Sequence, residues 1–214
     1  DLQNHPNFMR IMNIHNDAQK NISELNGSLR EIENPELLLS SFYLHESISS
    51  SAVENIHTTI ESALEDETKP EQERSDANKE VINYRKAIEA GRDYLNQYGL
   101  SSRTIKNIHK ALEVKKGIPG EFRTVQNKLA NKRIDGTEIV IYTPPTISIL
   151  NELLGNWETF VDKDKSIFPL IKTAICHYQF EAIHPFEDGN GRTGRILMVL
   201  QLMIEEMLDY PVLF

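Results

Sequence analysis

The segment from His184 to Arg195 limits the possible folds of this chain more than any other segment, because a glycine-rich turn lies there between two apolar stretches. It reads His-Pro-Phe-Glu-Asp-Gly-Asn-Gly-Arg-Thr-Gly-Arg. Apolar residues recur at helical spacing over 165–182 and again over 190–208, so the pattern predicts a helix, a loop and a second helix. A glycine-rich loop that leads into a helix exposes backbone N–H groups, which is typical of a phosphate site.

Two arginines strengthen the prediction of an anion site. The first turn of a helix carries partial positive charge and favours Asp or Glu, yet Arg192 and Arg195 lie there. Residues three apart share one helical face, so the two guanidinium groups would repel each other unless an anion lay nearby. A di- or triphosphate satisfies this requirement. A solvated arginine pair after a surface turn is the alternative.

The complete segment resembles the signature of the Fic family, His-x-Phe-x-Asp/Glu-Gly-Asn-Gly-Arg-x-x-Arg, at every specified position. The resemblance extends to the segment from Pro119 to Pro145 and to a helix near Glu54. It implies an all-α fold, a Fic-type helical bundle with a small β-hairpin flap over the active site. It also implies an ATP-dependent protein adenylyltransferase, which transfers the AMP part of ATP to a side-chain hydroxyl of a protein.

The resemblance gives each residue of the segment an expected role. His184 is the expected catalytic base, because imidazole titrates near neutral pH and an attacking hydroxyl must lose its proton. Asp188 is the expected ligand of Mg²⁺, which is commonly held by one or two carboxylates and phosphate oxygens. Arg195 is expected to reach the γ-phosphate and Arg192 the β-phosphate, while Phe186 anchors the loop in the core. The expected nucleotide-binding residues are Gly189, Asn190, Gly191, Arg192, Thr193, Gly194 and Arg195.

Other interpretations of this site stay open. His184 ends an apolar helix, where a histidine is often a packed or capping residue. His177, Glu181 and His184 share a helix face and offer a metal site as an alternative, although the spacing is not that of His-Glu-x-x-His and we expect His177 to be exposed. The same site suits phosphoryl or another nucleotidyl transfer. A regulatory module that binds nucleotide without turnover is the alternative from a different class.

A second motif lies far upstream, at Ser50-Ser51-Ala52-Val53-Glu54-Asn55. It resembles the Fic-family inhibitory motif, Ser/Thr-x-x-x-Glu-Gly/Asn, of the class whose inhibitory helix is N-terminal. Ser50 and Glu54 are four residues apart, so we expect them on one helical face, with the hydroxyl orienting the carboxylate. Glu54 is then expected to pair with Arg195 and keep it from a γ-phosphate. Ser50, Glu54 and Asn55 are the candidate inhibitory residues, and a solvated helical glutamate is the alternative.

Hydrophobic periodicity and capping residues predict a largely helical chain. The predicted helices cover approximately 8–25, 35–60, 76–98, 102–112, 146–160, 165–182 and 190–208. Pro35 follows the cap Asn34, Gly99 ends one helix, and Ser102 caps the next. The charged stretch 65–76 is predicted to be an exposed loop.

The clearest β signal is Asp135-Gly136, between a short run that ends at Ile134 and the β-prone segment Ile139–Tyr142. It predicts a hairpin. In the Fic family the corresponding flap holds a target segment through main-chain pairing, so the resemblance implies that this hairpin docks the protein target. A plain surface hairpin is the alternative. The segment Gly120-Glu121-Phe122-Arg123 also resembles the family, and we assign it no catalytic role.

Composition narrows the class of protein. The 214 residues suit one globular unit. We divide it into an N-terminal helical region over 1–75 and a Fic core over 76–214. Apolar residues at the C-terminal end lead us to expect a truncated core. The net charge of −9 disfavours nucleic acid and anionic lipid as partners, and no apolar stretch could span a bilayer. Cys176 is expected to be a buried, reduced thiol.

These features predict a cytoplasmic enzyme. Its expected partners are ATP and a protein that presents a Ser, Thr or Tyr hydroxyl, with the enzyme itself among the candidate targets. No nucleic acid or membrane partner is expected, and a homodimer is left open.

Overall fold

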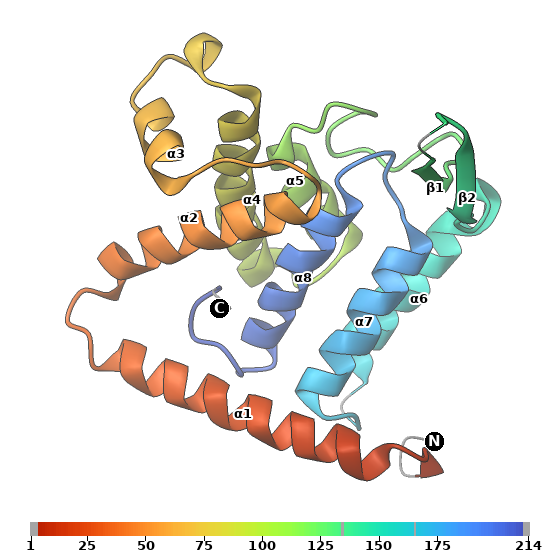
Figure 1. Cartoon of the computed structure of the whole chain (residues 1–214). Coiled ribbons are helices and arrows are strands. Elements are labelled where there is room, and N and C mark those ends of the chain that lie inside the picture. Colours follow the sequence, from red (N-terminus) through yellow and green to blue (C-terminus); the bar gives the residue numbers. More distant parts are fainter. Residues whose placement is uncertain (1–3, 134, 165, 212–214) are drawn as a thin grey trace.

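The computed structural model describes residues 4–133, 135–164 and 166–211. Within these residues the chain forms eight α-helices and one two-stranded antiparallel sheet, so the predicted helical bundle with a hairpin is confirmed (Figure 1). The helices are α1 Phe8–Arg30, α2 Pro35–Val53, α3 Ile60–Glu67, α4 Asp76–Tyr98, α5 Ser102–Leu112, α6 Leu150–Lys163, α7 Pro169–Ile183 and α8 Asn190–Ile204. Short 3-10 turns lie at η2 Glu71–Glu73 and η3 Ile147–Ile149, and the strands are β1 Leu129–Lys132 and β2 Glu138–Tyr142.

The main hydrophobic core lies between α4, α5, α6, α7 and α8. Its largest buried side chains include Trp157 and Phe180, whose rings pack 6.2 Å apart. The indole N–H of Trp157 donates to the Cys176 carbonyl at 2.9 Å, which satisfies a polar group that burial would otherwise penalise. Cys176 is buried, as the sequence predicts. The core therefore fixes α7 and α8, the two helices that flank the glycine-rich loop.

The first two helices wrap this core from outside (Figure 1). α1 packs on α7 and is tied to the segment after α8, because the Asn26 side chain donates to the Met207 carbonyl at 2.8 Å. α2 contacts both α4 and α8. Its C-terminal end consequently reaches the beginning of α8.

The predicted helices over 76–98 and 102–112 are confirmed. Gly99 ends α4 with a φ of 59°, a left-handed value that glycine adopts without steric cost. The predicted cap of α5 is wrong by one residue: Ser101 is the N-cap and accepts a bond from the Thr104 N–H, whereas the Ser102 N–H donates to Glu158 at 2.6 Å. Both serines are suitable caps, so the sequence alone does not distinguish them.

The predicted continuation of the second helix to Ile60 is wrong. α2 ends at Val53, and Asn55 adopts a φ of 61°. Asparagine is among the few residues that enter the left-handed region readily, and this conformation stops a helix. Glu54 is therefore the C-cap residue of α2 and lies at a bend of the backbone.

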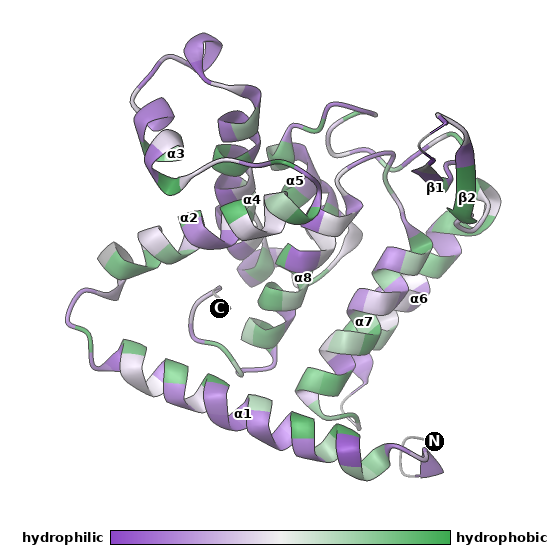
Figure 2. Ribbon diagram, in the orientation of Figure 1, coloured by the Kyte–Doolittle hydropathy of each residue, from purple (hydrophilic) through white to green (hydrophobic). Residues whose placement is uncertain are grey.

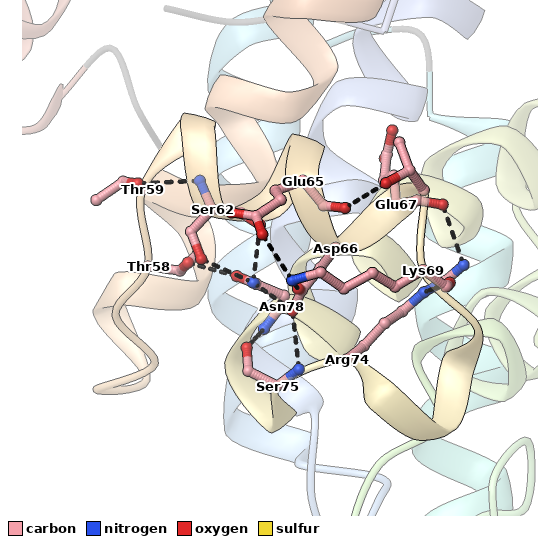
Figure 3. Close-up of polar contacts among 11 residues, drawn as sticks. Thr58, Thr59, Ser62, Glu65, Asp66, Glu67, Lys69, Arg74, Ser75 and Asn78 are labelled. Carbon is pink, nitrogen blue, oxygen red and sulfur yellow. Dashed lines mark hydrogen bonds and ion pairs between the residues drawn. The ribbon is translucent and has the colours of Figure 1, made fainter.

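Most of the stretch 65–76 is exposed, as predicted. The prediction that it is a loop is wrong, because α3 and η2 occupy much of it and a polar network holds it to α4 (Figure 3). Asp66 is 5% exposed and accepts hydrogen bonds from the Asn78 side chain at 2.6 Å and the Ser75 N–H at 2.8 Å. These donors, together with Lys69, hold the pKa of Asp66 well below its usual range. The Thr58 hydroxyl donates to the side-chain amide oxygen of Asn78, so the segment after Glu54 is tied to the same network.

The hairpin pairs Ala130 with Val140 and Lys132 with Glu138. Its turn contains Gly136, with a φ of 83°, as the Asp-Gly signal predicts; Ile134 lies outside the described residues. β2 is apolar yet exposed along its length, as its hydrophobic colour in Figure 2 and its burial pattern show. No helix in the described ranges is both long and apolar enough to cross a membrane.

Candidate active site

The glycine-rich loop connects α7 to α8 through a turn that begins at His184. This residue is the C-cap of α7 and has φ 50° and ψ 61°, in the left-handed region. A histidine in this conformation stores strain, on the order of 1–2 kcal/mol, that the surroundings must offset. The turn is consequently held by several side chains.

Three side chains hold the backbone of this turn. Arg123 donates from Nε to the His184 carbonyl at 2.9 Å, and its own N–H donates to the Pro185 carbonyl at 2.8 Å. Asn127 donates to the Phe186 carbonyl at 3.0 Å. Asn190 accepts from the Phe186 N–H and donates to the same residue's carbonyl, both at 2.9 Å. The direction of the His184 side chain is therefore fixed by its backbone.

His184 has the properties of a proton acceptor. Burial lowers the pKa of its imidazole and Arg123 lowers it further, while the Glu181 carbonyl and Glu54 oppose these effects, so the neutral form dominates at pH 7. Nδ1 lies 3.3 Å from the Glu181 carbonyl oxygen. This contact favours the tautomer with the proton on Nδ1, which leaves the lone pair of Nε2 to accept a proton.

The beginning of α8 is an anion site by geometry. Thr193 is the first residue of the helix whose N–H bonds to a backbone carbonyl, that of Gly189 at 3.0 Å. The N–H groups of Asn190, Gly191 and Arg192 have no acceptor among the described residues. Unpaired N–H groups and the positive end of the helix dipole together favour a bound anion.

Glu54 supplies an internal anion at this helix end. Its Oε1 lies 3.0 Å from Nη2 of Arg195, and a Cβ atom added to Gly191 would collide with the same oxygen. Ser50 accepts a bond from Nε of Arg195 at 2.6 Å through its hydroxyl, and its carbonyl accepts from Nη2 at 3.0 Å. The structure thus corrects one detail of the expected motif: Ser50 binds the arginine, and no bond joins it to Glu54 among the described residues. Asn55 acts through its backbone, which bends the chain after Glu54.

Arg192 also has a carboxylate partner, which the sequence did not predict. Its Nη1 lies 2.9 Å from Oε2 of Glu80 in α4, and the side chain is almost fully buried. The two arginines are therefore neutralised by separate glutamates rather than only by an external anion. Glu80 carries no local motif and is 112 residues away in sequence, so only the tertiary fold reveals the pair.

Several expected nucleotide-binding residues have side chains committed to the loop and the helix packing. The Asn190 amide binds Phe186, as described above, and the Thr193 hydroxyl donates to the Gly189 carbonyl at 2.8 Å. Gly194 packs against Glu181 and His177, where a Cβ atom would collide with the Glu181 carboxylate. The side chains of Asn190 and Thr193 are thus engaged within the loop and the helix, and the backbone N–H of Asn190 is unpaired among the described residues.

Asp188 has the chemistry of a Mg²⁺ ligand at the edge of this site. Its side chain is 34% exposed, and Oδ1 accepts the Gly189 N–H at 2.7 Å. Oδ2 has no hydrogen-bond donor among the described residues. One open carboxylate oxygen beside an anion loop fits a cation that takes its other ligands from phosphate and water. The described residues contain no group of three or more His, Cys, Asp or Glu side chains that could hold a metal ion by themselves.

That finding removes the alternative metal site of His177, Glu181 and His184. The expectation of an exposed His177 is also wrong: its Nδ1 is buried and lies beside Gly194, because α7 and α8 pack closely there. Burial raises the pKa of Glu181 to about 7, with Arg195 lowering it and Glu54 raising it. A second carboxylate thus lies near the Arg195–Glu54 pair and titrates near neutrality.

His109 is a site residue that sequence reasoning missed. Its ring stacks on Phe186 with centroids 3.6 Å apart, Nδ1 accepts the Gly120 N–H at 2.9 Å, and Nε2 lies 3.0 Å from the Asp188 carbonyl oxygen. Nε2 must therefore carry the proton and donate. Burial lowers the pKa of His109 to about 4, so it remains neutral. It lies inside an amphipathic helical stripe, where no local signal distinguishes it from a core residue.

Two protein-family models match this chain, and together they contain both the Glu54 segment and the glycine-rich loop. The model for the N-terminal part of the Fic/DOC family matches residues 12–93, and the Fic/DOC family model matches residues 99–202. This chain belongs to the Fic/DOC family. The first match contains the Glu54 segment and the second contains the complete loop from His184 to Arg195.

Curated relatives of this Fic protein carry the name protein adenylyltransferase. The Fic protein adenylyltransferase of Aedes aegypti is 24% identical over 189 residues, which are 87% of this chain and 36% of the relative. A probable protein adenylyltransferase of Aquifex aeolicus is 37% identical over 68 residues, 32% of this chain and 21% of the relative. The chain therefore spans about a third or less of these relatives.

Solved structures share the fold. A Fic-domain signaling protein from Bacteroides thetaiotaomicron has a TM-score of 0.65 at 21% identity, covering 86% of this chain and 71% of that structure. A fragment of Fic-1 from C. elegans has a TM-score of 0.63 at 22% identity, covering 91% and 59%. The arrangement of helices is thus that of the Fic fold.

Proposed function

We propose that this Fic protein transfers AMP from ATP to a side-chain hydroxyl of a protein, and that Glu54 restrains the reaction. The observation that carries the proposal is the beginning of α8, which has three unpaired N–H groups and where the Glu54 carboxylate lies against Gly191 and pairs with Arg195. A carboxylate bound there has the charge of a phosphate group. The names of the relatives support the same reaction class.

The proposed chemistry uses groups already in place. His184 accepts the hydroxyl proton at Nε2 while the oxygen attacks the α-phosphorus of ATP. The bond from that phosphorus to the bridging oxygen breaks, and pyrophosphate leaves with the electron pair. The α8 N–H groups and Arg195 stabilise the phosphate charge, which is the main catalytic contribution in such transfers.

Mg²⁺ fits the edge of this site through Asp188. When bound, the ion would neutralise phosphate charge and help to orient the leaving group. Asp188 is itself oriented by the Gly189 N–H, while its backbone carbonyl is held by His109. These contacts keep the open carboxylate oxygen beside the helix end.

The proposed target binds along the hairpin. β2 is exposed, apolar and close to the end of α7, because the Tyr142 hydroxyl donates to the Ala182 carbonyl at 2.7 Å. Pairing of a target segment with an exposed strand supplies main-chain hydrogen bonds with little demand on sequence. A hydroxyl on that segment would then approach His184.

Intact-mass measurement tests the reaction. The Glu54→Gly protein is incubated with ATP and Mg²⁺, alone and with cell lysate, and the His184→Ala/Glu54→Gly protein serves as the control. We expect an added AMP on a Ser, Thr or Tyr residue only when His184 is present. An added phosphate would instead establish phosphoryl transfer, and ATP binding without a covalent product would establish a regulatory module; either result refutes the proposal.

A further inference from the structure

Arg123 is a buried cation that takes no direct part in the proposed AMP transfer. Only 2% of its surface is exposed, and no carboxylate lies within ion-pair distance of it among the described residues. Burial of a guanidinium without a carboxylate is costly and is tolerated only where other acceptors replace water. Here backbone carbonyls accept from Nε and Nη2, while Nη1 is buried without a hydrogen-bond partner among the described residues.

These carbonyls belong to two separate parts of the active site. Nε of Arg123 donates to the His184 carbonyl at 2.9 Å, and Nη2 donates to the Pro145 carbonyl at 2.5 Å. His184 begins the catalytic loop, whereas Pro145 follows β2 at the foot of the hairpin. One planar guanidinium therefore connects the backbone of the proposed base to the strand that would hold the target.

Neighbouring contacts extend the same connection. Gln126 donates to the Pro144 carbonyl at 2.8 Å, and Asn127 donates to the Phe186 carbonyl at 3.0 Å. The segment 123–127 thus binds the hairpin foot and the catalytic turn together. Among its side chains only Arg123 contacts both parts, and it does so through two nitrogens of a rigid fork.

We propose that Arg123 is a positioning residue that couples the foot of the hairpin to the His184 backbone and so fixes the distance between a docked target hydroxyl and the imidazole. This inference rests on the proposed function and deepens it. The left-handed backbone conformation of His184 is unfavourable for a histidine. The hydrogen bond from Arg123 to the His184 carbonyl stabilises this conformation and thereby the direction of the imidazole. The contact with Pro145 transmits the same constraint to β2.

The positive charge of Arg123 has a second consequence. It lowers the pKa of His184 below the value that burial alone would give. An uncharged replacement should therefore raise the pKa of His184, so that a larger fraction of the imidazole is protonated and unable to accept a proton. Lysine keeps the charge but cannot make both carbonyl bonds in the same geometry.

Three variants in the Glu54→Gly background separate these effects: Arg123→Gln, Arg123→Lys and, as a matched control, Arg103→Gln. Arg103 lies over the Tyr98 ring at the beginning of α5, and no hydrogen bond or ion pair joins it to the catalytic loop or the hairpin among the described residues. The measurements are NMR titration of the His184 imidazole, hydrogen exchange of residues 129–142, and kcat and KM for ATP across pH.

We expect Arg123→Gln to raise the pKa of His184, to speed exchange in the hairpin, and to lower kcat on the order of tenfold to a hundredfold with little change in KM for ATP. We expect Arg123→Lys to speed hairpin exchange and lower kcat while leaving the pKa of His184 near that of the parent. Arg103→Gln should match the parent in all three measurements.

Two results would overturn the coupling. One is hairpin exchange and a His184 titration in Arg123→Gln that equal those of the parent. The other is an Arg123→Lys protein with the full kcat of the parent. Exchange and titration need no turnover, so failure of the proposed reaction in every variant would be a separate result from failure of the coupling.

Discussion

Glu54 and Arg195 face each other across the beginning of α8, with Oε1 of the glutamate 3.0 Å from Nη2 of the arginine. The carboxylate also lies directly against Gly191, where a Cβ atom would meet its Oε1. It thereby places a negative charge at the N-terminal end of the helix. An ion pair between partly exposed groups is weak in itself, so the position of the carboxylate matters more than the strength of the pair.

The Glu54→Gly protein should bind a non-hydrolysable ATP analogue more tightly than the wild type. Release of Arg195 allows a charge-assisted bond to phosphate worth about 1.5–3 kcal/mol, which corresponds to roughly tenfold to a hundredfold in Kd. Isothermal titration calorimetry with Mg²⁺ measures this change. Glu33→Gly, at an exposed position between α1 and α2, is the matched control. Equal affinity of Glu54→Gly and wild type would show that Glu54 does not compete with nucleotide.

Unfolding free energy should depend on pH through His109. Its pKa is about 4 in the folded protein and about 6.5 when unfolded, so the unfolded chain binds more protons between these values. Stability is thus fully present above pH 6.5 and falls as the pH decreases, on the order of 2 kcal/mol between pH 7 and pH 5. Urea unfolding measures the change at both pH values. The His109→Gln protein, although less stable, should lose less unfolding free energy between pH 7 and pH 5 than the wild type. An identical loss in the two proteins would exclude His109 as the source of the pH dependence.

The helices differ in how well their ends could be predicted from the sequence. The bounds of α4 and α5 match the prediction from sequence because their signals are local: apolar spacing and the terminating Gly99. The C-terminal end of α2 does not match, since the apolar stripe that includes Ile60 continues beyond the true end and the helix stops through the backbone conformation of Asn55. Periodicity describes which face could be buried, and it does not show where the chain bends.

The same contrast holds in the site. The pairing of Glu54 with Arg195 could be predicted because both ends lie in short motifs. Arg192 with Glu80 and His109 with Asp188 could not, since one partner of each pair lies on an ordinary amphipathic helix and is selected only by tertiary packing. Arg123 lies in a segment that resembles the family, yet its bonds go to backbone carbonyls, which leave no trace in a sequence.

Nucleotide affinity should respond to the charge of Glu181. This carboxyl lies near Arg195, and burial raises its pKa to about 7. Above this pH the group becomes an anion beside the proposed phosphate site and repels the nucleotide. The Glu54→Gly background removes the contribution of Glu54 that raises this pKa and keeps the contribution of burial. In that background, affinity for the ATP analogue should therefore decrease with rising pH more in the Glu181 parent than in Glu181→Gln. Parallel pH profiles of the two proteins would exclude Glu181 as the titrating group.

The network around Asp66 should help to keep Glu54 in its inhibitory position (Figure 3). Thr58 lies four residues after Glu54 and donates to Asn78, whose side chain is bound by Asp66. Thr58→Val removes this bond with little change in shape. A hydrogen bond worth about 1 kcal/mol corresponds to roughly fivefold, so automodification of the otherwise wild-type protein should rise by about that factor.

The effect of Thr58 on activity must act through Glu54. Thr58→Val should add nothing to the activity of Glu54→Gly, because the restraint is already absent there. Thr68→Val is the matched control, since its hydroxyl donates to the Glu65 carbonyl on the exposed end of α3. Incorporation of label from ATP is measured for five proteins: the wild type, Thr58→Val, Glu54→Gly, Thr58→Val/Glu54→Gly and Thr68→Val. If Thr58→Val raised automodification equally with and without Glu54, the effect would not act through Glu54. The network around Asp66 would then play no part in the restraint of Arg195.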